Sequence, residues 1–239
     1  MSVKLGITGS RPCGYLDEQE ERLIVTVTDE HTPMNAHLYE HLMAHGFRRS
    51  HNDVYRPHCE FCQACQSLRL PVNEFNYSKN QKRVLSKNRD LVLNITDTPQ
   101  PDYTSLFCQF IEERHADGAM YPPDPESFWL WCDADWMKPQ FFEWRDSEGT
   151  LKMVSVVDVL ARSSSAMYTF FDPSEHKRSL GTYSILSLIE WTAAQGLDYL
   201  YLGYQIDACD KMNYKARFTP NERLIGNHWK KAVKSPTQK

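Results

Sequence analysis

The segment RPHCEFCQACQSLRLPV carries three cysteines at intervals of three residues: Cys59, Cys62 and Cys65. Thiols with this spacing bind a metal ion, take part in redox reactions, or share one face of a helix. Three thiolates need a fourth ligand to close a tetrahedral site, and Cys13 or His58 is available for it. Three alternatives stay open: the segment binds zinc, it binds an iron–sulfur cluster, or it binds no metal. A bound metal would have a structural or regulatory role.

The turn before residue 180 is a second place where residue types point to chemistry. Arg178, Ser179 and Gly181 lie between the predicted strand YTFFDP and the predicted helix SLGTYSILSLIEWTAAQG. Backbone N–H groups at a helix N-terminus bind phosphate with help from the helix dipole, and glycine lets the backbone approach closely. The turn resembles the R/Q-x-x-G-x-G/A motif of the GNAT acyltransferase superfamily, with Thr182 at the second small-residue position.

The strands on either side of this turn are predicted over residues 166–171 and 199–205. GNAT folds splay two such strands apart, hold the acyl donor in the gap, and offer a backbone N–H of the first strand to the oxyanion. Tyr204, where the gap would open, is our candidate for proton transfer or substrate positioning, although packing is the ordinary role of tyrosines on a strand face. Phe171 joins the candidate catalytic residues, and Tyr168 joins the candidate substrate-binding residues.

The elements that position these residues follow from the hydrophobic patterns. Helical spacing predicts helices near residues 34–45, 103–115 and 179–195, and Gly46 is the expected stop of the first. Ser78 is the expected N-cap of a basic helix over residues 79–89, whose apolar side is thin. Alternating segments predict strands near residues 68–72, 91–95, 140–145, 151–161, 165–173 and 197–206. A strand meander followed by strand, helix and strand indicates an α+β fold. We expect a smaller cysteine-bearing N-terminal α+β domain over residues 1–97 and a GNAT-like acyltransferase domain over residues 98–239.

Charge is unevenly distributed along the 239 residues, whose formal net charge is −4. Residues 66–90 carry a net charge of +4 and residues 211–239 carry +7, whereas residues 97–148 carry −9. Such a chain can present a basic surface to a polyanion, although the last ten residues read more simply as solvating. No segment approaches the roughly 18 apolar residues of a membrane helix, and no export signal is evident, so we expect a cytoplasmic protein with reduced thiols.

Several motifs taken together resemble the arginyl/leucyl-tRNA–protein transferase family. They are LMAHGFRRS, YRPHC..C..C...R.PV, YTFFDP, RSLGTY, YLGY.I and KMNYKARFTP, and the resemblance spans about residues 11–230. The short length and the cysteine spacing are most similar to the bacterial, leucyl-transferring branch. The resemblance implies an enzyme that moves leucine from Leu-tRNA to the N-terminal α-amino group of proteins beginning with Asp or Glu. Such a transfer would mark these proteins for degradation in the N-degron pathway.

The resemblance also implies roles for particular residues. A cation must face the carboxylate of the acceptor, and the planar fork of arginine suits it best. The candidates are Arg48, Arg49, Arg69 and, as first choice, Arg56. Asp158, a polar residue in an apolar strand, either anchors the α-ammonium of the acceptor or is a hydrogen-bonded structural residue. The tRNA phosphates and the CCA end would meet Arg178, Ser179, Gly181, Lys82, Arg83, Lys211 and Lys215.

The implied transfer needs no cofactor, because the donor ester is already activated and the α-amino group has an ordinary pKa of roughly 7.7–8.0. Eukaryotic relatives are known to bind an iron–sulfur cluster or haem, and their N-terminal motif reads C-G-Y-C. Here the motif is CGYL, with Leu16 in place of the second cysteine, which weakens the expectation of a four-cysteine cluster. The alternative functions are arginyl transfer, acetyl transfer from acetyl-CoA, and a zinc-ribbon RNA-binding module, although a ribbon predicts paired CxxC knuckles.

Overall fold

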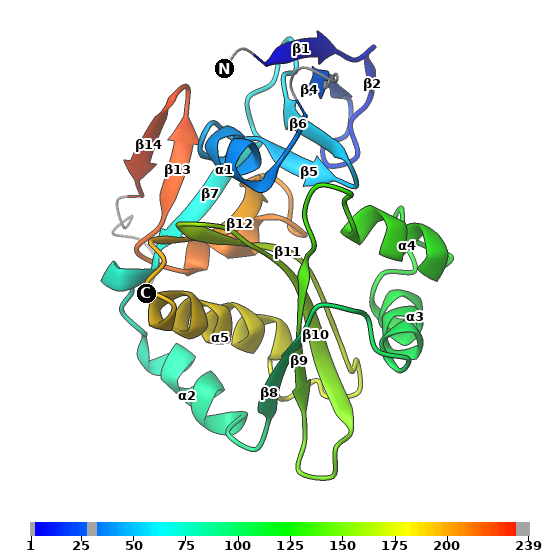
Figure 1. Cartoon of the computed structure of the whole chain (residues 1–239), viewed down its shortest axis with the longest axis vertical. Coiled ribbons are helices and arrows are strands. Elements are labelled where there is room, and N and C mark those ends of the chain that lie inside the picture. The colour runs from blue at the N-terminus through cyan, green and yellow to red at the C-terminus, as the bar shows by residue number, and fades with distance from the viewer. Residues whose placement is uncertain (1–2, 28–32, 233–239) are drawn as a thin grey trace.

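The computed structural model describes residues 3–27 and 33–232, which fold around two main β-sheets (Figure 1). The smaller sheet has the strand order β1-β4-β6-β5, with the bounds Lys4–Ile7, Leu23–Val27, Asp53–Pro57 and Arg48–Ser50. Beside it, β2 (Arg11–Pro12) and β3 (Glu20–Glu21) form a ladder of their own. Helix α1 (Ala36–Ala44) begins after its N-cap Asn35 and ends before Gly46, whose φ of +90° favours glycine, as the sequence predicts.

Eight strands form the larger sheet, in the order β14-β13-β7-β12-β11-β10-β9-β8. Their bounds are β7 Gln66–Pro71, β8 Val92–Thr96, β9 Gln140–Arg145, β10 Leu151–Val159, β11 Ser163–Phe171, β12 Tyr199–Gln205, β13 Glu222–Ile225 and β14 His228–Lys231. Every neighbouring pair is antiparallel except β11 and β12. The predicted α+β class is confirmed.

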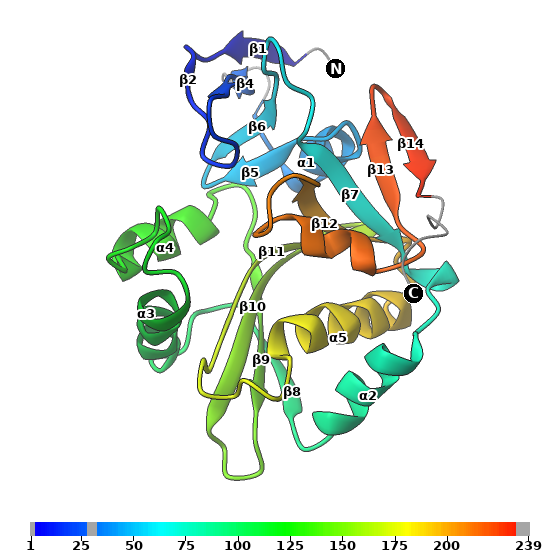
Figure 2. The same ribbon diagram turned by 180° about the vertical axis from the view of Figure 1, so that it is seen from behind.

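Helices cover both faces of the larger sheet (Figures 1 and 2). They are α2 (Lys79–Lys87), α3 (Tyr103–Arg114), α4 (Pro125–Cys132) and α5 (Leu180–Ala194), with the short 3₁₀ helices η1 (Val72–Glu74) and η2 (Asn213–Arg217). α2 and α5 lie side by side over a core that includes Leu188 and Trp144. α3 and α4 pack over a second core that includes Phe107 and Phe170. Among the described residues, no helix has the length and apolarity needed to cross a membrane.

The larger sheet includes two strands that precede residue 97, β7 and β8. β7 follows the cysteine segment and lies between β12 and β13, while β8 forms an edge of the sheet next to β9. α2, which connects these two strands, packs on α5. The division expected near residue 97 therefore does not coincide with the division between the two sheets. The cysteine segment leads directly into the strand that borders β12.

β11 and β12 run parallel but are paired only at their first residues. Ser165 and Tyr201 are the last residues paired between them, and further along each strand the ladder partner is β10 or β7 instead. In β11 the register against β10 shifts by one residue, which leaves Met167 as a β-bulge. The predicted separation of these two strands is confirmed, and it begins directly after Ser165.

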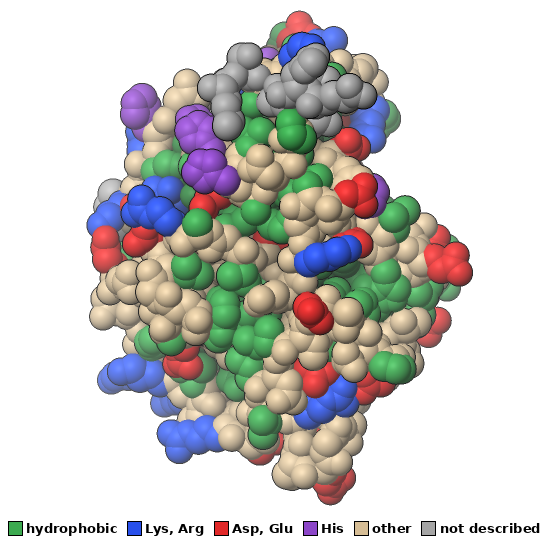
Figure 3. Space-filling model, in the orientation of Figure 1, with side chains coloured by type: hydrophobic (Ala, Val, Ile, Leu, Met, Phe, Trp, Pro, Cys, Tyr) green, Lys and Arg blue, Asp and Glu red, His purple; other side chains and the backbone are tan. Residues whose placement is uncertain are grey.

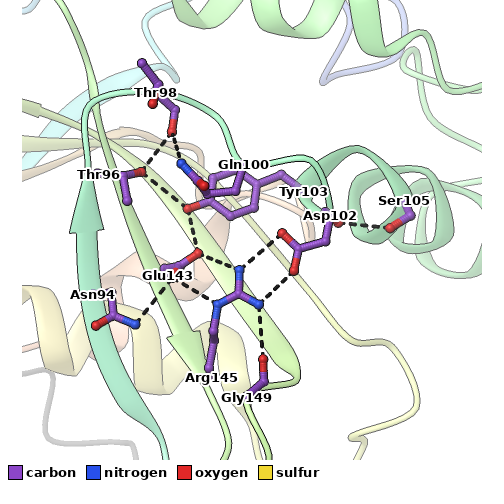
Figure 4. A network of polar contacts seen from close by, with 10 residues as sticks. All are labelled: Asn94, Thr96, Thr98, Gln100, Asp102, Tyr103, Ser105, Glu143, Arg145 and Gly149. Carbon is purple, nitrogen blue, oxygen red and sulfur yellow. Dashed lines mark hydrogen bonds and ion pairs between the residues drawn. The ribbon is translucent and has the colours of Figure 1, made fainter.

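A polar network attaches α3 and β8 to β9 at a distance from this separation (Figure 4). Glu143 accepts hydrogen bonds from Tyr103 Oη at 2.8 Å, from Asn94 Nδ2 at 3.3 Å and from Arg145 Nη2 at 2.8 Å. Arg145 also binds Asp102, at 2.7 Å. Burial acts to raise the pKa of Glu143, but the hydrogen bonds from Arg145 and Tyr103 hold it below its usual value. Glu143 is therefore an ionised carboxylate that organises the network.

The proline-rich segment 118–129, whose composition suggests a loop, contains the start of α4. Asp124 caps this helix, because its Oδ1 accepts a hydrogen bond from the Ser127 N–H at 3.1 Å. Pro125 occupies the first turn, where the missing N–H of proline costs no helical hydrogen bond. Prolines that are typical of loops are here part of a helix start.

Candidate active site where β11 and β12 separate

Arg48 extends from β5 of the smaller sheet to the point where β11 and β12 separate. Its Nη1 donates to Ser165 Oγ at 2.8 Å, and its Nη2 donates to the Ala166 carbonyl at 3.0 Å. The guanidinium lies against Gly203 of β12, whose φ of +80° favours glycine. Arg48 is 9% exposed, and no carboxylate of the described chain lies within ion-pair distance of it. It is a buried cation with spare donors beside the gap between the two strands.

Lys215 of η2 is a second buried cation near Arg48. It is 5% exposed, and its Nζ lies 3.4 Å from the Met212 carbonyl, 3.5 Å from the Met212 Sδ and 4.8 Å from the centre of the Tyr214 ring. Burial, followed by the charge of Arg48, lowers the pKa of Lys215 to about 8. Its low exposure gives no support to the expected role of Lys215 as a surface contact to tRNA, which stays a prediction.

Tyr204 follows Gly203 in β12 and fastens this strand to the smaller sheet. Its Oη donates to the Gly46 carbonyl at 2.9 Å, with the Tyr55 carbonyl at 3.4 Å. Burial raises the pKa of Tyr204 well above its usual value. A phenol that is hard to ionise and already bonded to backbone is a structural contact, and the geometry gives no support to its expected role in proton transfer.

Arg49 and Asp158 form an ion pair in which both side chains are fully buried. Arg49 Nε donates to Asp158 Oδ2 at 2.9 Å, and Arg49 Nη2 donates to Asp158 Oδ1 at 2.6 Å. The guanidinium also donates to the carbonyls of Cys132 and Asp133, at 2.7 and 3.2 Å. Each charge is satisfied by the other, and the pair links β5 to β10. This geometry favours the structural alternative for Asp158 over a catalytic one and gives no support to substrate binding by Arg49.

The other two candidate arginines are also engaged within the protein. Arg56 donates from Nη1 to the His45 carbonyl at the end of α1, at 2.9 Å. Arg69 pairs with Glu222 at 2.8 Å and lies over two aromatic rings, 3.7 and 4.1 Å from their centres. Of the four arginines, Arg48 alone lies beside the separated strands without a carboxylate or a helix end to hold it. The surroundings therefore favour Arg48 over Arg56, the first choice made from the sequence, and the role of either arginine stays a prediction.

The turn before α5 is held by the end of α2. Arg178 donates from Nε to Asn88 Oδ1 at 2.8 Å and pairs with Asp90 at 2.5 Å. Ser179 has a φ of +55° and makes no side-chain cap. The N–H groups of Thr182 and Tyr183 donate to the Ser179 carbonyl, both at 3.0 Å, whereas those of Leu180 and Gly181 precede any intrahelical partner. The ring of Phe171 lies against Gly181, where an added Cβ would be 3.4 Å away. Phe171 and Arg178 shape this turn, and its backbone remains suited to a phosphate.

Tyr168 lies one residue beyond the bulge in β11 and packs on α4. Its ring centre is 5.3 Å from that of Phe128 and 6.0 Å from that of Trp131. Burial raises the pKa of Tyr168 to about 12. It is a half-buried tyrosine on the α4 side of the gap, and its role in substrate binding stays a prediction.

The other candidate tRNA contacts are exposed. Lys82 and Arg83 lie on the solvent side of α2, where Figure 3 shows basic side chains gathered at the lower left of the molecule. Lys82 and Arg89 line a groove of about 440 Å³ between α2 and α5. Lys211 is exposed beyond β12 and pairs with Asp117 at 2.7 Å. These positions suit contacts to phosphate groups.

The cysteines expected to hold a metal line one pocket of about 570 Å³ beside the smaller sheet: Cys13, Cys59, Cys62 and Cys65. Burial, followed by the charges of the other three thiols, raises the pKa of Cys65 to about 12. Four thiols are a donor set for zinc or an iron–sulfur cluster. Yet nowhere in residues 3–27 and 33–232 are three His, Cys, Asp or Glu side chains placed as metal ligands. The four thiols are the right kind of donor, but their present arrangement does not form a metal site. Metal binding therefore stays a prediction.

Sequence reasoning could not separate Arg48 from the other arginines. The carboxylates that occupy Arg49 and Arg69 lie 109 and 153 residues away along the chain. One usable signal was present in β12, because an isolated glycine inside a strand pattern indicates a bulge or a close approach. Gly203 is that residue, and the group that approaches it is Arg48.

Two sequence models of one protein family match the chain. "Arginine-tRNA-protein transferase, N terminus" matches residues 11–83, and "Arginine-tRNA-protein transferase, C terminus" matches residues 102–225. The "Aspartate/glutamate leucyltransferase" of Aeromonas salmonicida (strain A449) is 45% identical over 234 residues, which cover 98% of this chain and 97% of the relative. The protein of the same name from Pseudoalteromonas atlantica (strain T6c / ATCC BAA-1087) is 45% identical over 227 residues, 95% of this chain and 96% of the relative.

Solved structures give a weaker likeness. FemX aligns with a TM-score of 0.48 at 7% identity, over 89% of this chain and 82% of that chain. L-PGS from Bacillus licheniformis aligns with a TM-score of 0.48 at 12% identity, over 71% of this chain and 51% of that chain. Neither carries an argument about function, so the function rests on the sequence relatives and on the geometry of the site.

Proposed function

The chain belongs to the arginine-tRNA-protein transferase family, and from this premise we propose that it is a leucyl-tRNA–protein transferase. It moves the leucyl group of Leu-tRNA onto the N-terminal α-amino group of proteins that begin with Asp or Glu. The names of relatives that share 45% of its residues over nearly the whole chain support both the leucyl group and the acidic acceptors. The added leucine marks the acceptor for degradation through the N-degron pathway.

The surroundings of Arg48 are the observation that supports the proposed binding of an acidic acceptor. A buried cation without a counter-ion costs several kcal/mol, and a bound carboxylate removes much of that cost. Arg48 keeps donors free beside the gap while Ser165 and Ala166 fix its plane. A planar guanidinium binds a carboxylate through two parallel hydrogen bonds. We assign the acidic side chain of the acceptor to Arg48, and an Ala or Asn acceptor would leave this cation unpaired.

The donor half of the proposal uses the opened strands. The ester of Leu-tRNA enters the gap after Ser165, where the bulge at Met167 interrupts the ladder and frees backbone N–H for the oxyanion. The turn at Ser179 and Gly181 and the exposed cations of α2 receive phosphates of the tRNA. The amine of the acceptor then attacks the ester carbonyl carbon, and the bond to the ribose oxygen breaks. No covalent enzyme intermediate is needed.

A transfer assay tests the proposal. Labelled Leu-tRNA, labelled Arg-tRNA and labelled acetyl-CoA are each offered with three peptides that differ only in a first residue of Asp, Glu or Ala. We expect label to move from Leu-tRNA to the Asp and Glu peptides and not to the Ala peptide. Faster transfer from Arg-tRNA would assign the other donor, and acetylation without tRNA would overturn the proposal.

A further inference from the structure

The surroundings of Lys215 are unusual for a buried lysine. Most of the buried polar groups around the site are satisfied, as Arg49 is by Asp158. Lys215 has no carboxylate within ion-pair distance in residues 3–27 and 33–232, and its oxygen partner, the Met212 carbonyl, is 3.4 Å away. An ammonium group held in this way loses its hydration and gains little in return. The neutral amine suits the same position, because it needs far less solvation.

The position of Lys215 relative to Arg48 suggests what a neutral amine would do there. η2 follows β12 and packs on it, and the Ala216 N–H of η2 donates to Gln205 Oε1 of β12 at 3.1 Å. Gln205 lies two residues beyond Gly203, which the Arg48 guanidinium contacts, so η2 with Lys215 and the Arg48 guanidinium lie at the same end of β12. In Asp and Glu the side-chain carboxylate and the α-amino nitrogen are separated by only two or three carbon atoms. An acceptor whose carboxylate lies on Arg48 therefore has its α-amino group within a few bonds of that guanidinium, at the end of β12 on which η2 packs.

We propose that Lys215 is the proton acceptor for the attacking amine, an inference that rests on the proposed leucyl transfer. The neutral α-amino nitrogen forms a bond to the ester carbonyl carbon, and Lys215 Nζ takes one proton from that nitrogen. The tetrahedral intermediate then expels the ribose oxygen, which receives the same proton from Lys215. The products are an amide and a free ribose hydroxyl, and Lys215 returns to its neutral form. Tyr204, which follows Gly203 in β12, already donates to the Gly46 carbonyl.

The groups that face Lys215 favour its neutral form. Arg48 of β5 opposes protonation, Cys209 of the loop after β12 acts in the other direction when ionised, and Tyr214 of η2 offers its ring face. Burial is the largest influence, and with Arg48 it holds the pKa of Lys215 at about 8. A base with a pKa near the working pH is the most efficient one.

The test compares Lys215→Arg and Lys215→Met with the wild-type protein in leucyl transfer to an Asp peptide at saturating Leu-tRNA. Arginine stays protonated and methionine has no basic group, so neither side chain can accept a proton. We therefore expect both variants to lose kcat by about 10²- to 10⁴-fold with little change in KM. Below pH 7 the slope of log(kcat/KM) against pH should fall by one in Lys215→Arg, because one ionisation is lost. Lys230→Met, on the exposed hairpin of β13 and β14, is the matched control and should keep both values.

Other outcomes overturn the inference. A raised KM with unchanged kcat in Lys215→Met would make Lys215 a binding group, and an unchanged slope in Lys215→Arg would exclude it as the base. Lys215→Met should melt no lower than the wild type, because it removes an uncompensated charge. Melting more than about 5 °C lower would show that the ammonium supports the fold. If the wild-type protein itself transfers no leucine, the proposed function fails instead.

Discussion

Arg48 and Arg49 are adjacent in β5 but meet opposite surroundings. Successive side chains of a strand point to opposite faces, so the two guanidinium groups reach different neighbours. Arg49 meets Asp158 and is neutralised, whereas Arg48 meets a serine hydroxyl and a carbonyl and keeps its charge uncompensated. Arg49 thereby stabilises the fold, and Arg48 supplies a cation to the candidate site. Their identical residue types in the sequence hide this division.

Breaking the Arg49–Asp158 pair should unfold the protein at lower denaturant concentration. Asp158→Asn leaves a fully buried guanidinium without its counter-ion, and we expect a loss of about 3–5 kcal/mol in the free energy of unfolding. The double variant Arg49→Met with Asp158→Leu removes both charges and should recover most of that loss. Urea unfolding of the three proteins measures both effects. Equal stability of Asp158→Asn and the wild type would contradict the structural role assigned to the pair.

At the scale of elements, the site depends on β12 being shared by two ladders. β12 pairs with β11 only up to Tyr201 and with β7 along most of its length, which leaves one side of the gap open. The resemblance of the turn at residues 178–182 to the GNAT motif, within a strand, helix and strand pattern, predicted this separation. It could not predict that β7 would border β12, since pairing between distant segments leaves no periodic signal in either one. For the same reason the sequence could not show that β7 and β8, which precede residue 97, belong to the larger sheet, and the domain boundary near residue 97 stays a prediction.

The network at α3 gives an element-scale prediction about pH. The pKa of Glu143 is lowered in the folded state, so its contribution to stability is full above its unfolded pKa of about 4.3 and is lost as pH falls through the folded value. Glu143→Gln should cost about 1.5–3 kcal/mol at pH 7, because it removes hydrogen bonds to a charged acceptor. The difference from the wild type should shrink as the pH falls below 4. Thermal melts from pH 7 to pH 3 measure it, and a difference that persists at pH 3 would contradict this account.

At the scale of the whole molecule, positive charge is concentrated on the exposed side of α2. The exposed cations of α2 lie next to α5, whose first turn borders the gap, so a polyanion bound along α2 would direct its end toward the site. The sequence predicted the basic segment and the helix through its capping residue, Ser78, whose capping box with Gln81 is present. It could not predict that Lys215 is buried, because burial of a lysine within a basic segment leaves no trace in charge counts.

Binding of Leu-tRNA should weaken steeply with salt, because bound phosphates release counter-ions. Lys82→Ala combined with Arg83→Ala should lower the affinity and reduce the slope of log K against log salt by about 1–2, one unit or slightly less for each phosphate that is no longer neutralised. Lys138→Ala, a change of an exposed lysine that lies before β9 and pairs with Asp133, is the matched control. Filter binding at a series of salt concentrations gives the slopes. Identical slopes in the wild type and the double variant would move the tRNA surface away from α2.

The central claim is that Arg48 binds the acidic side chain of the acceptor. The ratio of kcat/KM for an Asp peptide to kcat/KM for an Asn peptide tests it. We would measure kcat/KM for two peptides that differ only in a first residue of Asp or Asn, in the wild type, in Arg48→Gln and in Arg56→Gln. The wild type should favour Asp by about 10- to 200-fold, the equivalent of about 1.5–3 kcal/mol for a hydrogen bond to a charged group. Arg48→Gln should bring the ratio close to one without weakening the binding of Leu-tRNA, and Arg56→Gln should keep the ratio. A preference for Asp that survives in Arg48→Gln and disappears in Arg56→Gln would contradict the account.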